Sequence, residues 1–414
     1  MGHHLGSKSS IVPLIDRLNK YPIGLVDSDK LREILSLLFD EREAFIASRF
    51  PLEEATLPEL VRLTKIPEVE LLPLLDKMAD KGLVMDMPYG EEVYYLLLPG
   101  LIGFFEFTFM KNRTDLPLER LAQLMREYLE ESQAGEFFGS KTPLTRSLLY
   151  EERIPVTSEV TSYEGARDII REAGFGAVGM CYCRHKKEHL NETCDKGAPV
   201  DGICISLGSA ARFMSRRGFA VEKNVDELLA VLDTARGYNL THITDNIRNK
   251  PSFICNCCSC CCELLAGVQM GYNNGIGKTG FRAVIDPDRC NGCGVCFRAC
   301  NVKAIALPEG VTFAKVSDRY ALVSNTLCLG CGACISVCRQ GALTMVPAAE
   351  REVPPLKRKD LYIRILKEKK RLTPFVVSGI KKSLRGLFTR KPPQKNIPII
   401  KDNPDFRQPP EWSP

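Results

Sequence analysis

The sequence lacks an apolar stretch long enough to cross a membrane. The longest candidate, residues 96–110, is broken by Pro99, Gly100, Gly103 and Glu106, whereas a spanning helix needs about 20 predominantly apolar residues. Residues 1–10 are mostly His, Gly, Ser and Lys and also lack the apolar run of a secretory signal. We therefore expect a cytoplasmic protein.

Nucleotide-binding fingerprints are missing as well. Residues 275–280 read Gly-Ile-Gly-Lys-Thr-Gly, but they lack the full spacing of a phosphate-binding P-loop and do not follow an expected strand. We interpret this segment as a linker, and we expect no nicotinamide or flavin site in the chain.

Cysteine is absent from residues 1–180 and 339–414 and abundant between them. Of the 18 cysteines, ten lie between residues 181 and 262 and eight between residues 290 and 338. In a reducing cytoplasm, closely spaced cysteines indicate metal binding rather than disulfides. The sequence therefore predicts two neighbouring metal-binding regions.

The eight downstream cysteines form a repeated motif. The spacing Cys-x2-Cys-x2-Cys-x3-Cys begins at Cys290 and again at Cys328. Residues 283–346 thereby resemble the bacterial two-[4Fe–4S] ferredoxins, in which the fourth cysteine of each motif ligates the other cluster. Separate zinc sites would leave the duplication unexplained. The resemblance implies two cluster-binding sets, Cys290, Cys293, Cys296 and Cys338 for one and Cys328, Cys331, Cys334 and Cys300 for the other.

Two details of these motifs concern the surroundings of the clusters. Glycines recur within both motifs and suit tight loops whose backbone N–H groups point at cluster sulfurs; they are Gly292, Gly294, Gly330 and Gly332. The family usually has proline after the fourth cysteine, but Asn301 and Arg339 stand there. We expect these departures to change the cluster environment without removing a ligand.

The ten upstream cysteines include a Cys-Tyr-Cys-Arg-His group and a Cys-Asn-Cys-Cys-Ser-Cys-Cys-Cys group. Thiolates this close together need a metal to neutralise their charge. They could hold two further [4Fe–4S] clusters with two cysteines spare, one such cluster plus a zinc, or an unusual larger cluster. The candidate ligands are Cys181, Cys183, Cys194, Cys204, Cys255, Cys257, Cys258, Cys260, Cys261 and Cys262.

The geometry of the second group bears on the number of centres. On a helix, Cys258, Cys261 and Cys262 would share a face while Cys257 and Cys260 would point elsewhere. That arrangement favours two centres, or one centre with structural cysteines left over. The region also resembles cysteine-rich domains fused to ferredoxin modules in iron–sulfur proteins of anaerobes, and this resemblance implies electron transfer.

Three histidines lie near the cysteines. His185 and His189 are one helical turn apart among Lys186, Lys187 and Glu188. We interpret this pair as part of a solvated helix face rather than as cluster ligands or tuning groups, and His242 as a loop or core residue.

The N-terminal region has the pattern of a helical domain. Helices are predicted over residues 31–39, 57–63 and 68–81, followed by a hairpin made of residues 83–87 and 93–98. This succession is similar to a winged helix.

The third of these helices would be the one that enters DNA. It carries Glu68, Glu70, Asp76 and Asp80, which the phosphates of DNA would repel. We therefore expect no nucleic-acid binding.

The middle of the chain alternates between helical and short apolar patterns. Helices are predicted over residues 118–132, 163–173, 206–217 and 225–236, and short buried strands over 177–180 and 252–254. Each strand leads directly into a cysteine group. We expect an α/β domain that presents its cysteines at strand ends.

Basic residues are concentrated near the C-terminus, where residues 356–395 hold 14 Lys and Arg against 2 Asp and Glu. An amphipathic helix is predicted over residues 374–391, and it suits an anionic membrane surface or a partner protein. The alternative is that it packs on the acidic body of its own chain. Its apolar face would consist of Phe375, Val376, Ile380, Leu384, Leu387 and Phe388.

Together these patterns predict an α+β protein with several domains. They are a winged-helix-like domain (1–115), a cysteine-rich metal-binding domain (116–275), a ferredoxin domain with two [4Fe–4S] clusters (276–350) and a basic tail (351–414).

The predicted function is electron transfer between a donor and an acceptor oxidoreductase, as a component rather than a stand-alone catalyst. The alternatives are a redox enzyme whose middle iron–sulfur centre meets a substrate, and a redox-sensing DNA-binding regulator. The expected partners are redox proteins, with docking of the tail at the inner membrane face as a further expectation.

Overall fold

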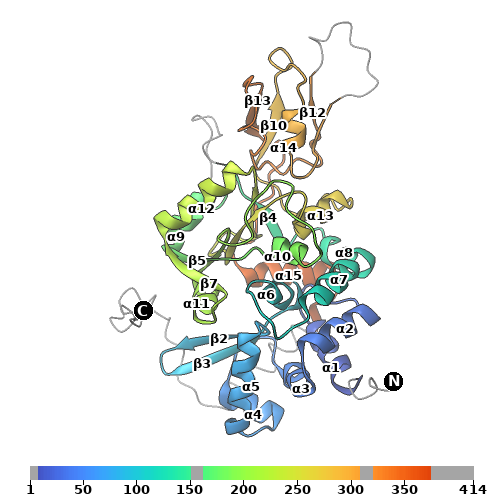
Figure 1. Ribbon diagram of the computed structural model, residues 1–414, viewed down its shortest axis with the longest axis vertical. Coiled ribbons are helices and arrows are strands. Elements are labelled where there is room, and N and C mark those ends of the chain that lie inside the picture. Colours follow the sequence, from blue (N-terminus) through green and yellow to red (C-terminus); the bar gives the residue numbers. More distant parts are fainter. Residues whose placement is uncertain (1–7, 151–161, 308–319, 374–414) are drawn as a thin grey trace. The chain divides into compact units, whose positions relative to one another are not determined.

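The computed structural model describes residues 8–150, 162–307 and 320–373 (Figure 1). Residues 1–372 form one unit and residues 373–414 a second. The helix expected at 374–391 lies outside the described residues. Within the described ranges, no helix is long and apolar enough to cross a membrane.

The N-terminal region consists of five helices and a small sheet. The helices are α1 (Lys8–Leu18), α2 (Asp29–Leu38), α3 (Glu41–Arg49), α4 (Leu57–Thr64) and α5 (Glu68–Asp80). The strands β1 (Ala55–Thr56), β2 (Val84–Tyr89) and β3 (Glu92–Leu97) form an antiparallel sheet in the order β1-β3-β2. The predicted helices and hairpin are confirmed. A capping box between Asp40 and Glu43 begins α3.

A second group of helices follows. It contains the π-helical turns η1 (Gly100–Phe104) and η2 (Leu129–Gln133) and the helices α6 (Phe105–Thr108), α7 (Leu118–Tyr128) and α8 (Ala134–Phe138). The apolar side of α7, including Leu121 and Met125, is buried. The helix predicted over residues 118–132 is confirmed, although its last turn is π-helical.

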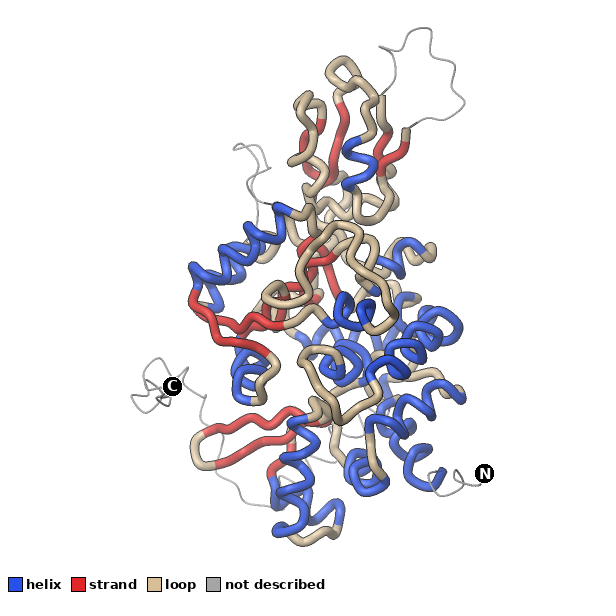
Figure 2. The backbone as a smooth tube through the Cα atoms, viewed as in Figure 1, coloured by secondary structure: helices blue, strands red, loops and turns tan. Residues whose placement is uncertain are grey.

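The middle of the chain forms a six-stranded sheet, drawn in red in Figure 2. Its order is β4-β8-β9-β6-β5-β7, and every neighbouring pair is antiparallel. The strands are β4 (Thr145–Ser147), β5 (Phe175–Gly179), β6 (Cys204–Leu207), β7 (Ala220–Asn224), β8 (Thr241–Asp245) and β9 (Phe253–Cys257). The associated helices are α9 (Ala166–Ala173), α11 (Gly208–Arg216) and α12 (Val225–Gly237). The short strands predicted before the two cysteine groups correspond to β5 and β9.

Alternation along the strands separates the cysteines from the apolar core. Ile205 and Ile254 belong to the apolar cluster formed with α9 and α12. Their chain neighbours Cys204 and Cys255 must therefore point to the opposite face, because successive side chains of a strand alternate. Cys257, two residues after Cys255, shares that face.

The downstream cysteines lie in a smaller β-rich region. Its antiparallel pairs are β10 (Phe281–Ile285) with β13 (Leu343–Pro347) and β11 (Ile305–Ala306) with β12 (Leu322–Val323), and the first motif continues into α14 (Val295–Ala299). Phe281, Ile305 and Met345 form a buried core together with Cys296 and Cys334. The apolar runs that follow each motif thus provide the strands that pack beneath the cysteines.

The first part of the basic tail packs against the rest of its unit. Helix α15 (Arg358–Glu368) buries Leu361, Ile365 and Leu366. Glu136 forms ion pairs with both Lys369 and Arg371. Residues up to 372 therefore belong to the main unit, and part of the basic charge is neutralised within it.

Candidate metal centres

The second ferredoxin set surrounds a single cavity. Cys300 from the first motif and Cys328, Cys331 and Cys334 from the second line a space of about 20 Å³. Burial raises the pKa of Cys331 to about 11 and places that of Cys334 well above the usual thiol range. Such thiols stay protonated until a metal ion displaces the proton. The donor set and its enclosure therefore fit an iron–sulfur cluster.

The first ferredoxin set is nearer the surface. Cys296 is buried, whereas Cys293 is exposed. Burial raises the pKa of Cys296, and the neighbouring Cys290 and Cys338 contribute to this shift through their charges. The fourth cysteine of the second motif thus lies beside the first motif, as the ferredoxin resemblance implies.

The glycines of both motifs have the backbone conformation that the sequence predicted. Gly292, Gly294, Gly330 and Gly332 all have positive φ, which side chains with a Cβ adopt at a cost. Gly330 is also closely packed, since an added Cβ would collide with the Phe281 carbonyl oxygen. The loops therefore need glycine for conformation, and at position 330 also for space.

Eight of the upstream cysteines line a second cavity, of about 30 Å³. Two of them, Cys258 and Cys261, also belong to the tighter group described below, and the other six form a set of their own. Cys181 follows β5 and Cys183 lies in α10 (Tyr182–Glu188), while Cys262 directly precedes α13 (Glu263–Gln269). The other three come from the strand face described above. We call this set the six-cysteine chamber: Cys181, Cys183, Cys204, Cys255, Cys257 and Cys262.

The thiols of the six-cysteine chamber hydrogen-bond to one another and are buried or half-buried. Hydrogen bonds with Cys204 and Cys257 lower the pKa of Cys255 to about 5. Burial opposes ionisation of Cys262, yet hydrogen bonds with Cys183 and Cys257 and with backbone N–H groups of α13 hold its pKa well below the usual range. At neutral pH the chamber thus contains thiolates, the form that binds metals.

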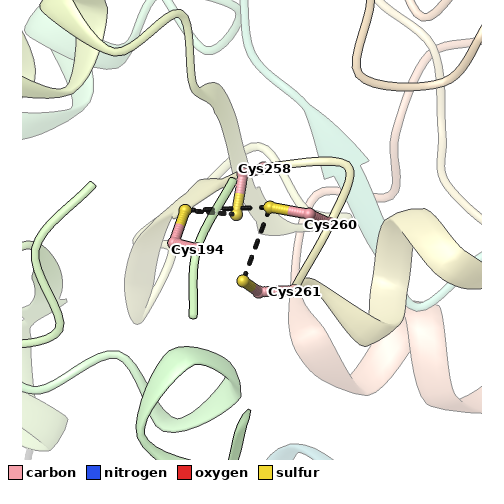
Figure 3. A group of neighbouring side chains, drawn as sticks. All are labelled: Cys194, Cys258, Cys260 and Cys261. Carbon is pink, nitrogen blue, oxygen red and sulfur yellow. Dashed lines mark hydrogen bonds between the residues drawn. The ribbon is translucent and has the colours of Figure 1, made fainter. Parts of the chain in front are cut away.

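The remaining four upstream cysteines form a separate, tighter group (Figure 3). The Sγ atom of Cys194 lies 3.7 Å from that of Cys258 and 3.7 Å from that of Cys260. The Sγ atoms of Cys260 and Cys261 are 3.5 Å apart. All four sulfurs lie within 4.8 Å of one another. We call this set the four-cysteine group.

The helix expected for this cysteine run is wrong. Strand β9 ends at Cys257, residues 258–261 form a turn, and α13 begins only at Glu263. Cys258 and Cys261 therefore belong to the four-cysteine group, whereas Cys262 lies only in the chamber. The run is divided because strand alternation orients its first cysteines, a turn orients the middle ones and a helix N-terminus orients the last.

Arg184 is a site residue that the sequence reasoning missed. Its guanidinium is almost fully buried, with 1% of the residue exposed, and it donates hydrogen bonds to the Asn256 carbonyl oxygen and to the Cys258 sulfur. Burial opposes its charge, but the neighbouring Cys181 and Cys258 raise the pKa of Arg184 above its ordinary value. A cation held between the two cysteine sets offsets their negative charge. The sequence feature that could have identified Arg184 is its position directly after Cys183 in the Cys-Tyr-Cys-Arg-His group.

The histidines do not join the cysteines. His185 is buried and its Nδ1 lies 2.8 Å from the Phe109 carbonyl oxygen, while its Nε2 lies 3.2 Å from that of His189. The expectation of a solvated face is therefore wrong for His185, because α6 and α7 cover this side of α10. His242 lies buried in β8, and its assignment to the core is confirmed.

A chain of hydrogen bonds joins the ferredoxin-type segment to the four-cysteine group. The Thr241 hydroxyl donates to the Cys331 sulfur at 3.7 Å. The Asn301 side-chain amide donates to the Thr241 hydroxyl at 2.9 Å, and its oxygen accepts from the Ser259 backbone N–H at 3.2 Å. Ser259 stands between Cys258 and Cys260. Asn301, one of the two departures from the family, thus connects two cysteine sites.

Comparison with known protein families supports the assignment of one of these regions. Residues 289–343 match the 4Fe-4S dicluster domain, a span that contains all eight downstream cysteines. This segment is a ferredoxin-type iron–sulfur segment. No curated protein and no solved structure matches the chain.

Proposed function

We propose that the protein is a multi-cluster iron–sulfur electron-transfer protein. In this proposal the two ferredoxin sets each bind a [4Fe–4S] cluster and the six-cysteine chamber binds a further iron–sulfur cluster. Such clusters accept and release single electrons, at potentials set by burial, charge and hydrogen bonds. The chain would serve an oxidoreductase as its electron-carrying component.

The single observation that carries the proposal is the direct connection between the two cysteine regions. Cys331, Thr241, Asn301 and Ser259 form one hydrogen-bonded chain. Asn301 is 2% exposed and Thr241 is fully buried, so the middle of this connection excludes bulk water. Two independent metal-binding domains would not need such a buried connection, whereas a protein that passes electrons from one region to the other would.

The surface offers one exposed ligand. Cys293 is exposed, and Phe297 on the adjoining α14 is also exposed. The chamber cysteines, by contrast, are buried or half-buried. We therefore propose that redox partner proteins dock near Cys293 and exchange electrons with the inner centres through the ferredoxin-type segment.

Anaerobic reductive titration tests this function. The intact protein should take up about three one-electron equivalents, one for each cluster, and return them to an oxidised viologen dye. The Cys331→Ala variant should lose one equivalent and its associated paramagnetic signal. Uptake of about two equivalents by the intact protein, both lost with the ferredoxin cysteines, would contradict a redox role for the chamber.

A DNA-binding role is disfavoured by the contacts of α5. Asp76 and Asp80 both form ion pairs with Arg217 of the same chain. This face of the helix is therefore acidic and already occupied. We propose that α5 serves internal packing, and we expect no salt-sensitive gel shift with duplex DNA.

Docking at a membrane surface is proposed for the basic tail. The apolar and basic residues of positions 374–391 suit anionic head groups, at roughly 1 kcal/mol for each basic residue near the surface. Sedimentation with anionic vesicles should be strong at low salt and weak at high salt. Binding that survives deletion of residues 373–414 would assign the interaction to another surface.

A further inference from the structure

The four-cysteine group differs in geometry from the cluster sites around it. Three of its sulfur–sulfur distances are 3.7, 3.7 and 3.5 Å. Among the described residues, it is the one set of three or more candidate ligands whose atoms all lie within 4.8 Å of one another. The ferredoxin cysteines and the six-cysteine chamber, which lie wholly in the described ranges, contain no set this compact.

These distances match a single tetrahedral metal ion. A tetrahedron with metal–sulfur bonds of about 2.3 Å has sulfur–sulfur edges of about 3.8 Å. A [4Fe–4S] cluster must hold its four thiolates much further apart, since four irons and four sulfides lie between them. Among the ferredoxin cysteines, by contrast, which all lie in the described ranges, no three sulfurs lie within 4.8 Å of one another.

The ligands come from two parts of the chain. Cys194 lies in the long connection between α10 and β6, which the structure shows without helix or strand between residues 190 and 203. The other three ligands lie in the turn after β9. Figure 3 shows Cys194 on its own segment, facing the turn that carries the others. A metal ion here would fasten the long connection to the turn.

The surroundings suit a fourfold thiolate site. Arg184 donates to the Cys258 sulfur, and Lys187 Nζ donates to the Cys260 carbonyl oxygen at 2.9 Å. Lys196 lies two residues after Cys194 in the sequence, and its Nζ donates to the Asn239 carbonyl oxygen at 3.0 Å. Three cations close to the group offset the surplus negative charge that four thiolates leave on a divalent or trivalent ion.

We propose that Cys194, Cys258, Cys260 and Cys261 bind one tetrahedral metal ion, zinc or iron, that clips the connection of residues 190–203 onto the β9 turn. Zinc and iron share this ligand chemistry. With zinc the site is purely structural, and with iron it could also carry an electron between its neighbours. The inference is independent of the electron-transfer proposal, because either ion would fasten the same loop.

Metal and sulfide analysis of full-length protein, purified without oxygen, tests the site. A zinc site adds about one zinc per chain, and an iron site adds about one iron in excess of acid-labile sulfide, because [4Fe–4S] clusters contain both in equal number. X-ray absorption at the zinc edge should show sulfur neighbours at about 2.3 Å without an iron neighbour. Intact protein with equal iron and sulfide and no zinc would overturn the proposal, whatever the variants do.

Serine substitutions then assign the ion to the group. Cys194→Ser should remove the single zinc, or the single surplus iron, while sulfide stays constant, and limited proteolysis should now cut between residues 190 and 203. The matched control is Cys204→Ser in the six-cysteine chamber, which should lower iron and sulfide together and leave the single ion in place. Loss of about four irons and four sulfides from Cys194→Ser would identify a cubane cluster instead, and unchanged metal content would show that the group binds none.

Discussion

Asn301 is the residue at which the two cysteine regions meet. Its side chain accepts from the Ser259 N–H and donates to the Thr241 hydroxyl and to the Asn239 carbonyl oxygen. A proline side chain at this position, as in the bacterial ferredoxin motif, could make none of these contacts. The departure from the family pattern is therefore explained by a neighbouring domain rather than by the cluster itself.

Replacing Asn301 by alanine should destabilise the junction. The substitution leaves the half-buried Ser259 N–H and the buried Thr241 hydroxyl without the partner that Asn301 supplies, and an unsatisfied buried group costs about 1–3 kcal/mol. We expect a lower midpoint of denaturation and a shifted potential for the cluster that uses Cys331. Arg339→Ala is the matched control, since Arg339 holds the equivalent position of the second motif and is exposed. Equal behaviour of the two variants would contradict the role of Asn301.

Gly330, before the second cysteine of the second motif, and Gly294, after the second cysteine of the first motif, tolerate a side chain differently. Both have positive φ. At Gly330 an added Cβ meets the Phe281 backbone oxygen, whereas at Gly294 its nearest neighbour is the flexible Leu307 side chain at 2.9 Å. Gly330→Ala should therefore abolish the cluster of the second set, and Gly294→Ala should lower occupancy only in part. Iron content and paramagnetic spectra should be measured for both variants. A greater loss of cluster in Gly294→Ala than in Gly330→Ala would contradict this prediction.

Glu106 should make stability depend on pH. Burial raises its pKa from 4.5 to about 7, even though it accepts a hydrogen bond from the Gly103 N–H. Between these two values the folded protein keeps a proton that the unfolded chain has lost, so stability is highest below about pH 4.5 and falls as pH rises to about 7. The full pKa shift corresponds to a loss of about 3 kcal/mol in the free energy of unfolding. We expect a smaller loss, because the side chain is only half-buried and solvent screens its charge.

The variant Glu106→Gln should remove this dependence. It is expected to raise the melting temperature at pH 8, where the native carboxylate is ionised, and to change little at pH 5. Glu222→Gln, at an exposed position, serves as the control and should have no effect at either pH. A stabilisation by Glu106→Gln that is the same at both values would rule out titration as its cause.

At the scale of elements, Arg217 holds the N-terminal hairpin and α5 to the middle sheet. Its guanidinium pairs with Asp76 and Asp80 of α5 and with Asp86 of β2. Burial raises the pKa of Asp86, but the neighbouring Arg217 and Arg216 lower it by more, so its pKa lies below the ordinary value. The charge on α5 that argues against DNA binding thus has a structural use.

Removing Arg217 should weaken this contact more than removing its neighbour. We expect Arg217→Ala to lower the free energy of unfolding by about 2 kcal/mol, because it leaves the buried Asp86 with one cationic partner fewer. Arg216→Ala removes a 3.3 Å ion pair with the Asp86 carboxylate and a hydrogen bond to the Asp86 carbonyl oxygen. Because the Arg216 side chain is more exposed than that of Arg217, this loss should cost less than about 1 kcal/mol. The free energies of unfolding of both variants can be measured by chemical denaturation monitored by circular dichroism. A larger loss of stability for Arg216→Ala than for Arg217→Ala would refute the role assigned to Arg217.

The elements were predictable where a single local pattern governs them. Apolar periodicity located α2, α5, α7 and α12, and the turn around Tyr89 located the β2–β3 hairpin. The cysteine run at 255–262 was mistaken for a helix because cysteine has no strong preference and the run has no apolar period. What orients those sulfurs is the pairing of β9 with β6 and β8, which depends on residues far away in the sequence.

At the scale of the whole molecule, the 18 cysteines fall into four sets. The two ferredoxin sets were predictable because the repeated motif resembles that of two-cluster ferredoxins, in which the fourth cysteine of each motif joins the other set. The division of the other ten into a chamber of six and a group of four was not, because Cys194 and Cys204 join their partners only through the folding of the sheet. The cations that accompany them, Arg184 above all, are likewise assembled from separate segments.

The central claim is that the upstream cysteines hold metal in addition to the two ferredoxin clusters. Iron, sulfide and zinc should be counted in anaerobically purified protein, together with the paramagnetic spectrum of the reduced state. The account predicts clearly more than about eight irons per chain, and a signal that persists when Cys293 and Cys331 are both replaced by alanine. About eight irons, an equal amount of sulfide, no zinc and no signal in that double variant would contradict it.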